Sequence, residues 1–172
     1  MRFMTRNSLW ATAVVLLVAL LPLLAASPAA AQDPDQAFAD YVNARFGYAC
    51  AYPADFEPQP EADNGDGRRF LSVKRNAEAA CWGSVLFMGD MAEEAADIIG
   101  IMEEAGTSVT YSRVEPDWFV LSGFEEDGRI FYRRTILRDG VLVSFLLRYP
   151  QSSRDAFDPV VAAMAQGLRF MH

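Results

Sequence analysis

Apolar and polar positions alternate through most of the chain after residue 44, and this two-residue period predicts β-strands. The clearest pair spans 129–138 and 141–149, joined by Asp139-Gly140. Asp-Gly between two apolar runs is a strong hairpin signal, because both turn residues tolerate positive φ. Further strands are expected at 45–52, 68–74, 79–87, 108–114 and 118–124. The stretch 57–67 is rich in proline, glycine and acidic residues and predicts a loop.

Two segments follow the 3.6-residue period of an amphipathic helix instead. The first spans 91–105, where Asp90 is the expected N-cap and Gly106 the stop signal. The second spans about 153–166, with an apolar stripe centred on Phe157 and Val160. Proline is tolerated only near the start of a helix, so Pro159 makes Asp158 the expected cap of this second helix.

The two-residue turn at Asp139-Gly140 also determines which residues of the hairpin lie opposite each other. One face of the hairpin pairs Ile136 with Val143, Tyr132 with Leu147, Ile130 with Tyr149, and Arg134 with Phe145. We expect this face to be core and the other to be mixed and half covered. Arg134 is the exception among apolar neighbours, and it either reaches the sheet edge or pairs with a carboxylate. Many strands with only two helices predict one antiparallel, layered α+β domain.

Residues 1–31 have the pattern of a secretory signal peptide. Arg2 and Arg6 precede a long apolar run, and small residues at Ala29 and Ala31 indicate cleavage before Gln32. The alternative interpretation is a membrane anchor, but the run is barely long enough to span a bilayer and contains Pro22. Residues 32–44 then form a polar lead-in with one or two helical turns, and the domain proper is expected at 45–172.

Composition excludes some partners. Without the leader, 13 basic residues face 23 acidic ones, a net charge of −10. A chain this acidic is repelled by nucleic acid and by anionic lipid, and no membrane span is expected after cleavage. Cys50 and Cys81 both lie in the exported part, where a pair of cysteines predicts a disulfide; two buried free thiols are the alternative.

The sequence lacks most catalytic constellations. His172 is the only histidine and the last residue, which argues against Ser-His-Asp, Cys-His and histidine–metal sites. No nucleophile motif, glycine-rich phosphate loop or dinucleotide fingerprint occurs. A hydrolase that works through a pair of carboxylates remains an alternative, since the chain has 23 acidic residues.

One loop has candidate binding chemistry. Asp63, Asn64 and Asp66 alternate with glycine as in part of a calcium loop, and Arg68 follows directly. The match is poor, because Val73 stands where the bidentate glutamate of that loop would be. The other interpretation is a tight turn, since Asn-Gly and Asp-Gly favour turns by φ preference alone. Aromatic residues that could line a ligand cleft are Phe46, Tyr48, Tyr52, Phe56, Trp82, Phe87 and Trp118.

Both ends of the domain resemble PsbP-like domains. The resemblance covers 46–170, through Phe46-Gly47-Tyr48 with Tyr52-Pro53-Ala54-Asp55-Phe56, then Arg148-Tyr149-Pro150, Phe157-Asp158-Pro159-Val160-Val161 and Gly167-Leu168-Arg169-Phe170. It implies a central antiparallel sheet with helices on both faces, an α/β/α sandwich. Members are usually accessory or binding proteins, and the best known is an extrinsic subunit of photosystem II. The sequence looks closer to exported bacterial relatives of unassigned function.

Together these observations predict a periplasmic or secreted, non-catalytic accessory protein. Its partner would be an envelope protein or a small ligand. The alternatives are a calcium-assisted binding module that uses the loop of Asp63 and Asp66, and a carboxylate-dependent hydrolase.

Overall fold

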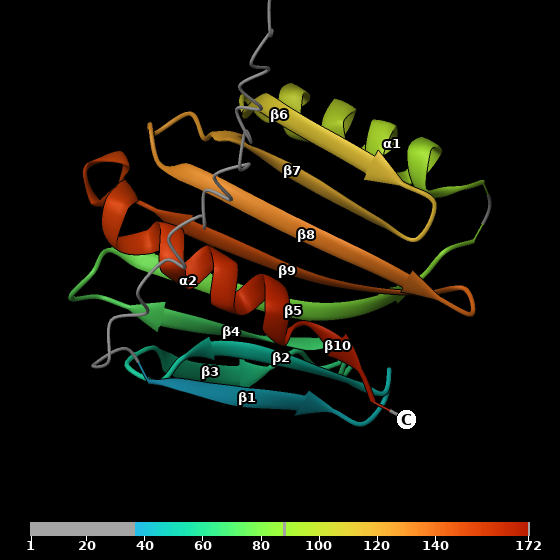
Figure 1. Cartoon of the computed structure of the whole chain (residues 1–172), viewed down its shortest axis with the longest axis horizontal. Coiled ribbons are helices and arrows are strands. Elements are labelled where there is room, and N and C mark those ends of the chain that lie inside the picture. Colours follow the sequence, from blue (N-terminus) through green and yellow to red (C-terminus); the bar gives the residue numbers. More distant parts are fainter. Residues whose placement is uncertain (1–36, 88, 172) are drawn as a thin grey trace, which may run out of the picture.

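A seven-stranded antiparallel sheet forms the centre of the structure, a computed structural model that describes residues 37–87 and 89–171 (Figure 1). The predicted leader and the cleavage site at Ala31 and Gln32 lie outside the described residues. The strand order is β3-β4-β5-β9-β8-β7-β6. Its members are β3 (Glu57–Glu61), β4 (Gly67–Ser72), β5 (Ala77–Val85), β6 (Ser108–Glu115), β7 (Trp118–Phe124), β8 (Ile130–Arg138) and β9 (Val141–Tyr149).

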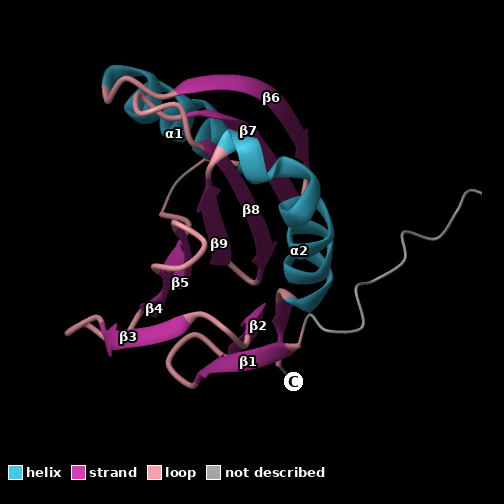
Figure 2. Cartoon of the chain, turned by 90° about the vertical axis from the view of Figure 1, so that its left-hand side faces the viewer, coloured by secondary structure: helices cyan, strands magenta, loops and turns pink. Residues whose placement is uncertain are grey.

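A second sheet packs against the β3–β5 end of the first, at the bottom of Figure 2. It has the order β1-β2-β10 and comprises β1 (Phe38–Asn43), β2 (Tyr48–Pro53) and β10 (Arg169–Phe170). The disulfide joins the two sheets, because Cys50 lies on β2 and Cys81 on β5, with their Sγ atoms 2.00 Å apart and their Cα atoms 6.4 Å apart.

Helices α1 (Met91–Glu104) and α2 (Arg154–Gly167) lie on opposite faces of the large sheet (Figure 2). Asp90 caps α1 as predicted, since its Oδ1 accepts from the backbone N–H of Ala92 at 2.8 Å and of Glu93 at 3.0 Å. The short 3-10 helix η1 (Gln151–Ser153) precedes α2. The predicted α+β arrangement, with helices on both faces of an antiparallel sheet, is confirmed. Within the described part of the chain, no helix combines the length and hydropathy needed to cross a bilayer.

The hairpin register is also confirmed: Ile136 lies opposite Val143, Tyr132 opposite Leu147 and Arg134 opposite Phe145. The turn residues Asp139 and Gly140 have φ of 52° and 77°, in the left-handed region that the Asp-Gly signal requires. The α2 face of this hairpin carries the main core, where Val143, Phe145 and Leu147 are fully buried. The other face is half covered as expected, because α1 packs on Phe131 and Leu142 and leaves Arg133 and Arg148 partly exposed.

Three local predictions are wrong. Residues 38–43 form strand β1 and not a helical turn, because pairing with β2 buries Tyr41 and Asn43. Part of the predicted loop 57–67 is strand β3, which tolerates Pro58 and Pro60 because it is an edge strand with an irregular register.

Asp158 is not the cap of the second helix, which begins at Arg154 and contains Pro159. Phe157 stacks on Tyr149 with ring centroids 4.5 Å apart, and Val160 is fully buried. Burial of these two side chains offsets the backbone hydrogen bond that proline cannot make.

Candidate functional site

The α2 face of the large sheet contains a cleft of about 360 Å³, within the usual range for small-ligand sites. It lies where α2 leaves β6, β7 and part of β8 uncovered. Its lining residues are Thr110, Tyr111, Ser122, Gly123, Phe124, Ile130, Tyr132, Tyr149, Arg154, Asp158 and Val161.

Three tyrosines from three strands, together with Phe124, form the aromatic part of the cleft. Tyr132 on β8 and Tyr149 on β9 share a face because of the hairpin register, and Tyr111 on β6 lies opposite Ser122 of β7 on that face. Tyr132 stacks on Phe145 at 5.7 Å between ring centroids, and Tyr149 stacks on Phe157 at 4.5 Å. Stacking holds these two rings in place, whereas Tyr111 is 52% exposed.

Burial further favours the neutral, protonated form of the inner tyrosines. It raises the pKa of Tyr132 above its ordinary value, although the nearby Arg134 acts in the opposite direction. Burial also raises the pKa of Tyr149, and the charge of Asp158 adds to that rise. Both hydroxyls therefore remain protonated at neutral pH and can donate and accept hydrogen bonds. Arg154 and Asp158 add one charge of each sign from α2.

Arg134, the exception on the core face of the hairpin, pairs with no carboxylate of the described residues. Its guanidinium lies 5.0 Å from the centroid of the Trp118 ring, and Arg113 lies over the same indole at 5.1 Å. The Nε atom of Arg134 is buried without a hydrogen-bond partner. A cation–π contact with Trp118 thus replaces the carboxylate pair that was one of the two sequence expectations.

The opposite face has a second hollow of about 340 Å³, lined by Asp66, Arg68, Arg69 and Trp82 among others. Nearby, Arg133 lies over the Trp82 ring at 5.0 Å and the Phe119 ring at 5.6 Å. Burial lowers the pKa of Arg133 to about 10, so this side chain is still a cation at neutral pH. Of the seven aromatic residues that the sequence suggested for a ligand cleft, Trp82 is the one that lines any of the three hollows on these two faces.

The predicted metal loop connects β3 and β4 and is held as a turn. Asn64 donates to Asp66 Oδ2 at 2.7 Å, and Gly65 has a φ of 65°. Arg68 lies 3.9 Å from Glu61 rather than over the loop acids. Among residues 37–87 and 89–171, no three His, Cys, Asp or Glu side chains gather closely enough to hold a metal ion, Asp63 and Asp66 included. Calcium binding through Asp63, Asn64 and Asp66 stays a prediction.

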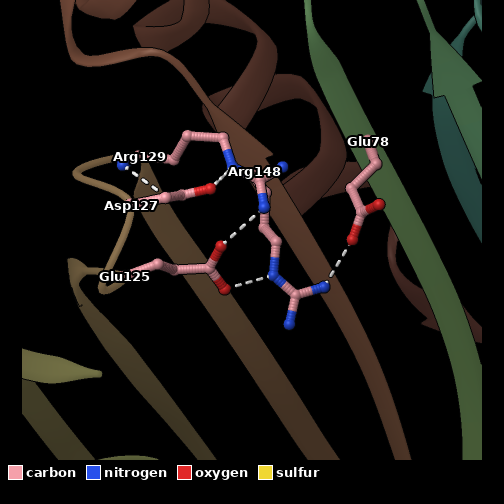
Figure 3. Close-up of polar contacts among 5 residues, drawn as sticks. All are labelled: Glu78, Glu125, Asp127, Arg129 and Arg148. Atoms are coloured by element: carbon pink, nitrogen blue, oxygen red, sulfur yellow. Dashed lines mark hydrogen bonds and ion pairs between the residues drawn. The ribbon is translucent and has the colours of Figure 1, made fainter. Parts of the chain in front are cut away.

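A network of ion pairs lies on the α1 face of the large sheet, near the start of β5 and the end of β9 (Figure 3). Arg148 Nη1 lies 2.6 Å from Glu78, and Arg148 Nε donates to Glu125. Arg129 joins Glu125 at 3.0 Å and Asp127 at 2.7 Å. Burial works against the charge of Arg148, but the two carboxylates more than offset it, and the pKa of this guanidinium is raised. All five side chains are paired, which indicates a structural role.

None of these hollows brings two carboxylates together. The α2-face cleft contains Asp158, the hollow beside Trp82 contains Asp66, and a smaller one of about 240 Å³ contains Glu78. Paired acids are what glycosidase-type hydrolysis requires. The three hollows therefore offer no support for the carboxylate-hydrolase alternative.

Comparison with known proteins rests on structure. Neither a protein-family model nor a curated protein sequence matches the chain. Among solved structures, the solution structure of cyanobacterial PsbP (CyanoP) from Synechocystis sp. PCC 6803 matches with a TM-score of 0.59 and 13% sequence identity. The match covers 78% of this chain and 93% of CyanoP. The chain has a PsbP-like fold. This confirms the fold that the sequence resemblance implied.

Sequence reasoning did not identify the cleft of the PsbP-like domain. The aromatics it selected are mostly core: Tyr48 and Phe56 are fully buried, whereas Phe87 is exposed. The register of the β8–β9 hairpin placed Tyr132 and Tyr149 on one face, and this was the one feature of the sequence that pointed to the cleft. The contributions of Tyr111 and Arg154 had no sequence signal, because they depend on how β6 and α2 pack on the β8–β9 hairpin.

Proposed function

We propose that this PsbP-like chain is an exported, non-catalytic binding protein of the periplasm or the extracellular space, and that it holds its ligand in the cleft on the α2 face. The observation that carries the proposal is the convergence of Tyr111, Tyr132 and Tyr149 with one charge of each sign. Aromatic surface with a few fixed polar groups is typical of ligand sites.

The chemistry of the cleft favours binding over turnover. Tyr132 and Tyr149 have raised pKa values because of burial, so at neutral pH they are poor nucleophiles and poor general bases. The cleft includes a single carboxylate, and the only histidine of the chain is the terminal residue. The PsbP-like fold agrees with an accessory role.

Export is supported by the signal-peptide pattern and by the buried Cys50–Cys81 disulfide, since disulfides persist in oxidising compartments. We expect cell fractionation to recover the protein outside the cytoplasm with Gln32 as its first residue, measured by N-terminal sequencing and intact mass. Cytoplasmic protein that retains Met1 and reduced thiols would contradict this address.

Ligand binding is tested by thermal melting of the mature protein against a panel of sugars, amino acids and aromatic acids. A ligand at a hundred times its Kd stabilises a protein by about 2.7 kcal/mol, which shifts Tm by several degrees. We expect such a shift for at least one panel member and its loss in Tyr111→Ala. Tyr111 is half exposed, so its truncation leaves the core intact.

Val114→Ala is the matched control, because Val114 is also a partly exposed residue of β6 but does not line the cleft. A shift that survives in Tyr111→Ala, or is lost equally in both variants, means that the ligand binds elsewhere. Product formation in a broad hydrolase screen would overturn the non-catalytic part of the proposal.

A further inference from the structure

The outer edge of β6 is a second candidate binding surface, separate from the cleft. β6 ends the seven-stranded sheet, and no strand of the described residues pairs with its outer side (Figure 1). It is eight residues long and contains no proline. At the opposite edge, β3 has five residues, two of them proline, and an irregular register. Short edges with prolines or bulges protect a sheet against added strands, which describes β3. The pairing of β6 with β7 is also irregular between Val109 and Tyr111, but it is regular from Tyr111 to Glu115, so this half of β6 is the unprotected edge.

The register of β6 with β7 shows which backbone N–H and C=O groups of β6 are free to bind an added strand. Glu115 pairs with Trp118 across the two-residue turn, and Val114 pairs with Phe119. Directly opposed residues of an antiparallel ladder alternate between hydrogen-bonded and non-hydrogen-bonded pairs. The backbone N–H and C=O groups of Ser112 and Val114 therefore point away from β7. An extended backbone provides donors and acceptors at the matching spacing, which is how a peptide adds a strand to a sheet.

The charge around this edge selects the kind of segment. Helix α1 runs alongside β6 (Figures 1 and 2) and has acidic residues but no Lys or Arg. Its acidic residues are Glu93, Glu94, Asp97, Glu103 and Glu104. On the other face of the sheet, β6 contributes Thr110 and Tyr111 to the cleft, and Arg113 lies over Trp118. The two sides of the edge thus differ, acidic towards α1 and aromatic towards the cleft.

We propose that the β6 edge binds an extended, cationic polypeptide segment of a partner by adding it as an eighth strand. This inference rests on the proposed function and names the partner class. Side chains of an added strand alternate between the two faces. Lysine or arginine would lie beside the acids of α1, and aromatic or β-branched residues would lie beside Tyr111 at the cleft.

A second copy of the chain fits this edge less well. Antiparallel pairing of two β6 strands requires a twofold axis perpendicular to the sheet, which leaves both α1 helices on the same face. The two acidic helices would then lie across the joint from each other and repel. A cationic segment has the opposite, favourable interaction with the same helix.

The probe is a blocked synthetic peptide that alternates lysine with valine and phenylalanine, titrated calorimetrically into the full mature protein. We expect Ser112→Pro to weaken binding about tenfold, because it removes an outward N–H worth about 1–1.5 kcal/mol. The β6–β7 ladder does not use that N–H, and proline is tolerated at sheet edges. Ser112→Ala is the control and should bind like the unsubstituted protein.

Two peptide variants test the same edge without altering the protein. Methylating the amides that face β6 should weaken binding about tenfold, whereas methylating the other set should not. Replacing lysine with glutamate should weaken it by a similar factor, and added salt should reduce that difference. Both peptide variants are measured with the unsubstituted protein, so they test the β6 edge even if Ser112→Pro fails to fold.

The inference is overturned if the lysine peptide does not bind, if amide methylation has no effect, or if sedimentation shows a dimer of the unsubstituted protein that Ser112→Pro abolishes. In the last case the occupant is a second copy. If the peptide does not bind but a small ligand still raises Tm in a way that depends on Tyr111, the proposed peptide site at the β6 edge is refuted and the cleft is not. If neither the peptide binding nor the Tyr111-dependent Tm shift is observed, the proposed ligand site in the cleft is refuted as well.

Discussion

Replacing both Cys50 and Cys81 with alanine lowers the free energy of unfolding by about 3–4 kcal/mol. The disulfide closes a loop with a sequence separation of 31, and the chain-entropy model gives that magnitude for such a loop. The bridge also holds the three-stranded sheet on the large one, since it joins β2 to β5 and both residues are fully buried. Because a domain of this size is stable by only about 5–15 kcal/mol, the loss is a large fraction of the total.

Urea unfolding followed by far-ultraviolet circular dichroism measures this effect. The midpoint should fall by roughly 1–4 M, given the usual slopes for small proteins. The unsubstituted protein in reducing agent serves as the control, because it lacks the bridge but keeps both sulfur atoms. Coincident unfolding curves for the oxidised and reduced protein would show that the bridge contributes nothing to stability.

Substitution Arg148→Met destabilises the domain by about 2–3 kcal/mol. Arg148 pairs with Glu78 of β5 and with Glu125 beyond β7, and the three side chains are mostly buried (Figure 3). Removing one partner of a buried pair costs about 3–5 kcal/mol, and the partial exposure of this network lowers that figure. Glu125 keeps its pair with Arg129, whereas Glu78 is left without a cation, so Glu78→Gln in the Arg148→Met background should recover about 1 kcal/mol.

The matched control is Arg113→Met. Arg113 pairs with Glu115 at 2.9 Å, but its side chain is 59% exposed, and such surface pairs contribute about 0–1 kcal/mol. Chemical unfolding of the variants gives the comparison. Equal losses for Arg113→Met and Arg148→Met would show that the buried network has no special weight in stability.

Local sequence signals predicted the hairpin and the first helix well. Asp139-Gly140 specified the turn and the register of β8 with β9, and Asp90 specified the start of α1, because both depend on φ preferences and on nearby hydrogen bonds. Strand β3 was missed because Pro58 and Pro60 argue against a strand unless it lies at an edge, and edge position is a property of the whole sheet.

Long-range packing decided the remaining differences. Arg134 finds the indole of Trp118, and α2 continues through Pro159 because Phe157 stacks on Tyr149. Each outcome depends on a partner from another element, which periodicity within one segment does not contain. The cleft is the same case, since Tyr111 and Arg154 lie on β6 and α2 and meet only once both elements pack on the β8–β9 hairpin.

By itself, the sequence determined the α+β class, the pairing of β8 with β9, the helix start at Asp90 and the expectation of export, because these depend on neighbouring residues. Only the tertiary structure decided which tyrosines share a cleft, which arginines are paired and which sheet edge stays open. The physical reason is that burial, ion pairing and strand order are set by contacts between segments far apart in the chain.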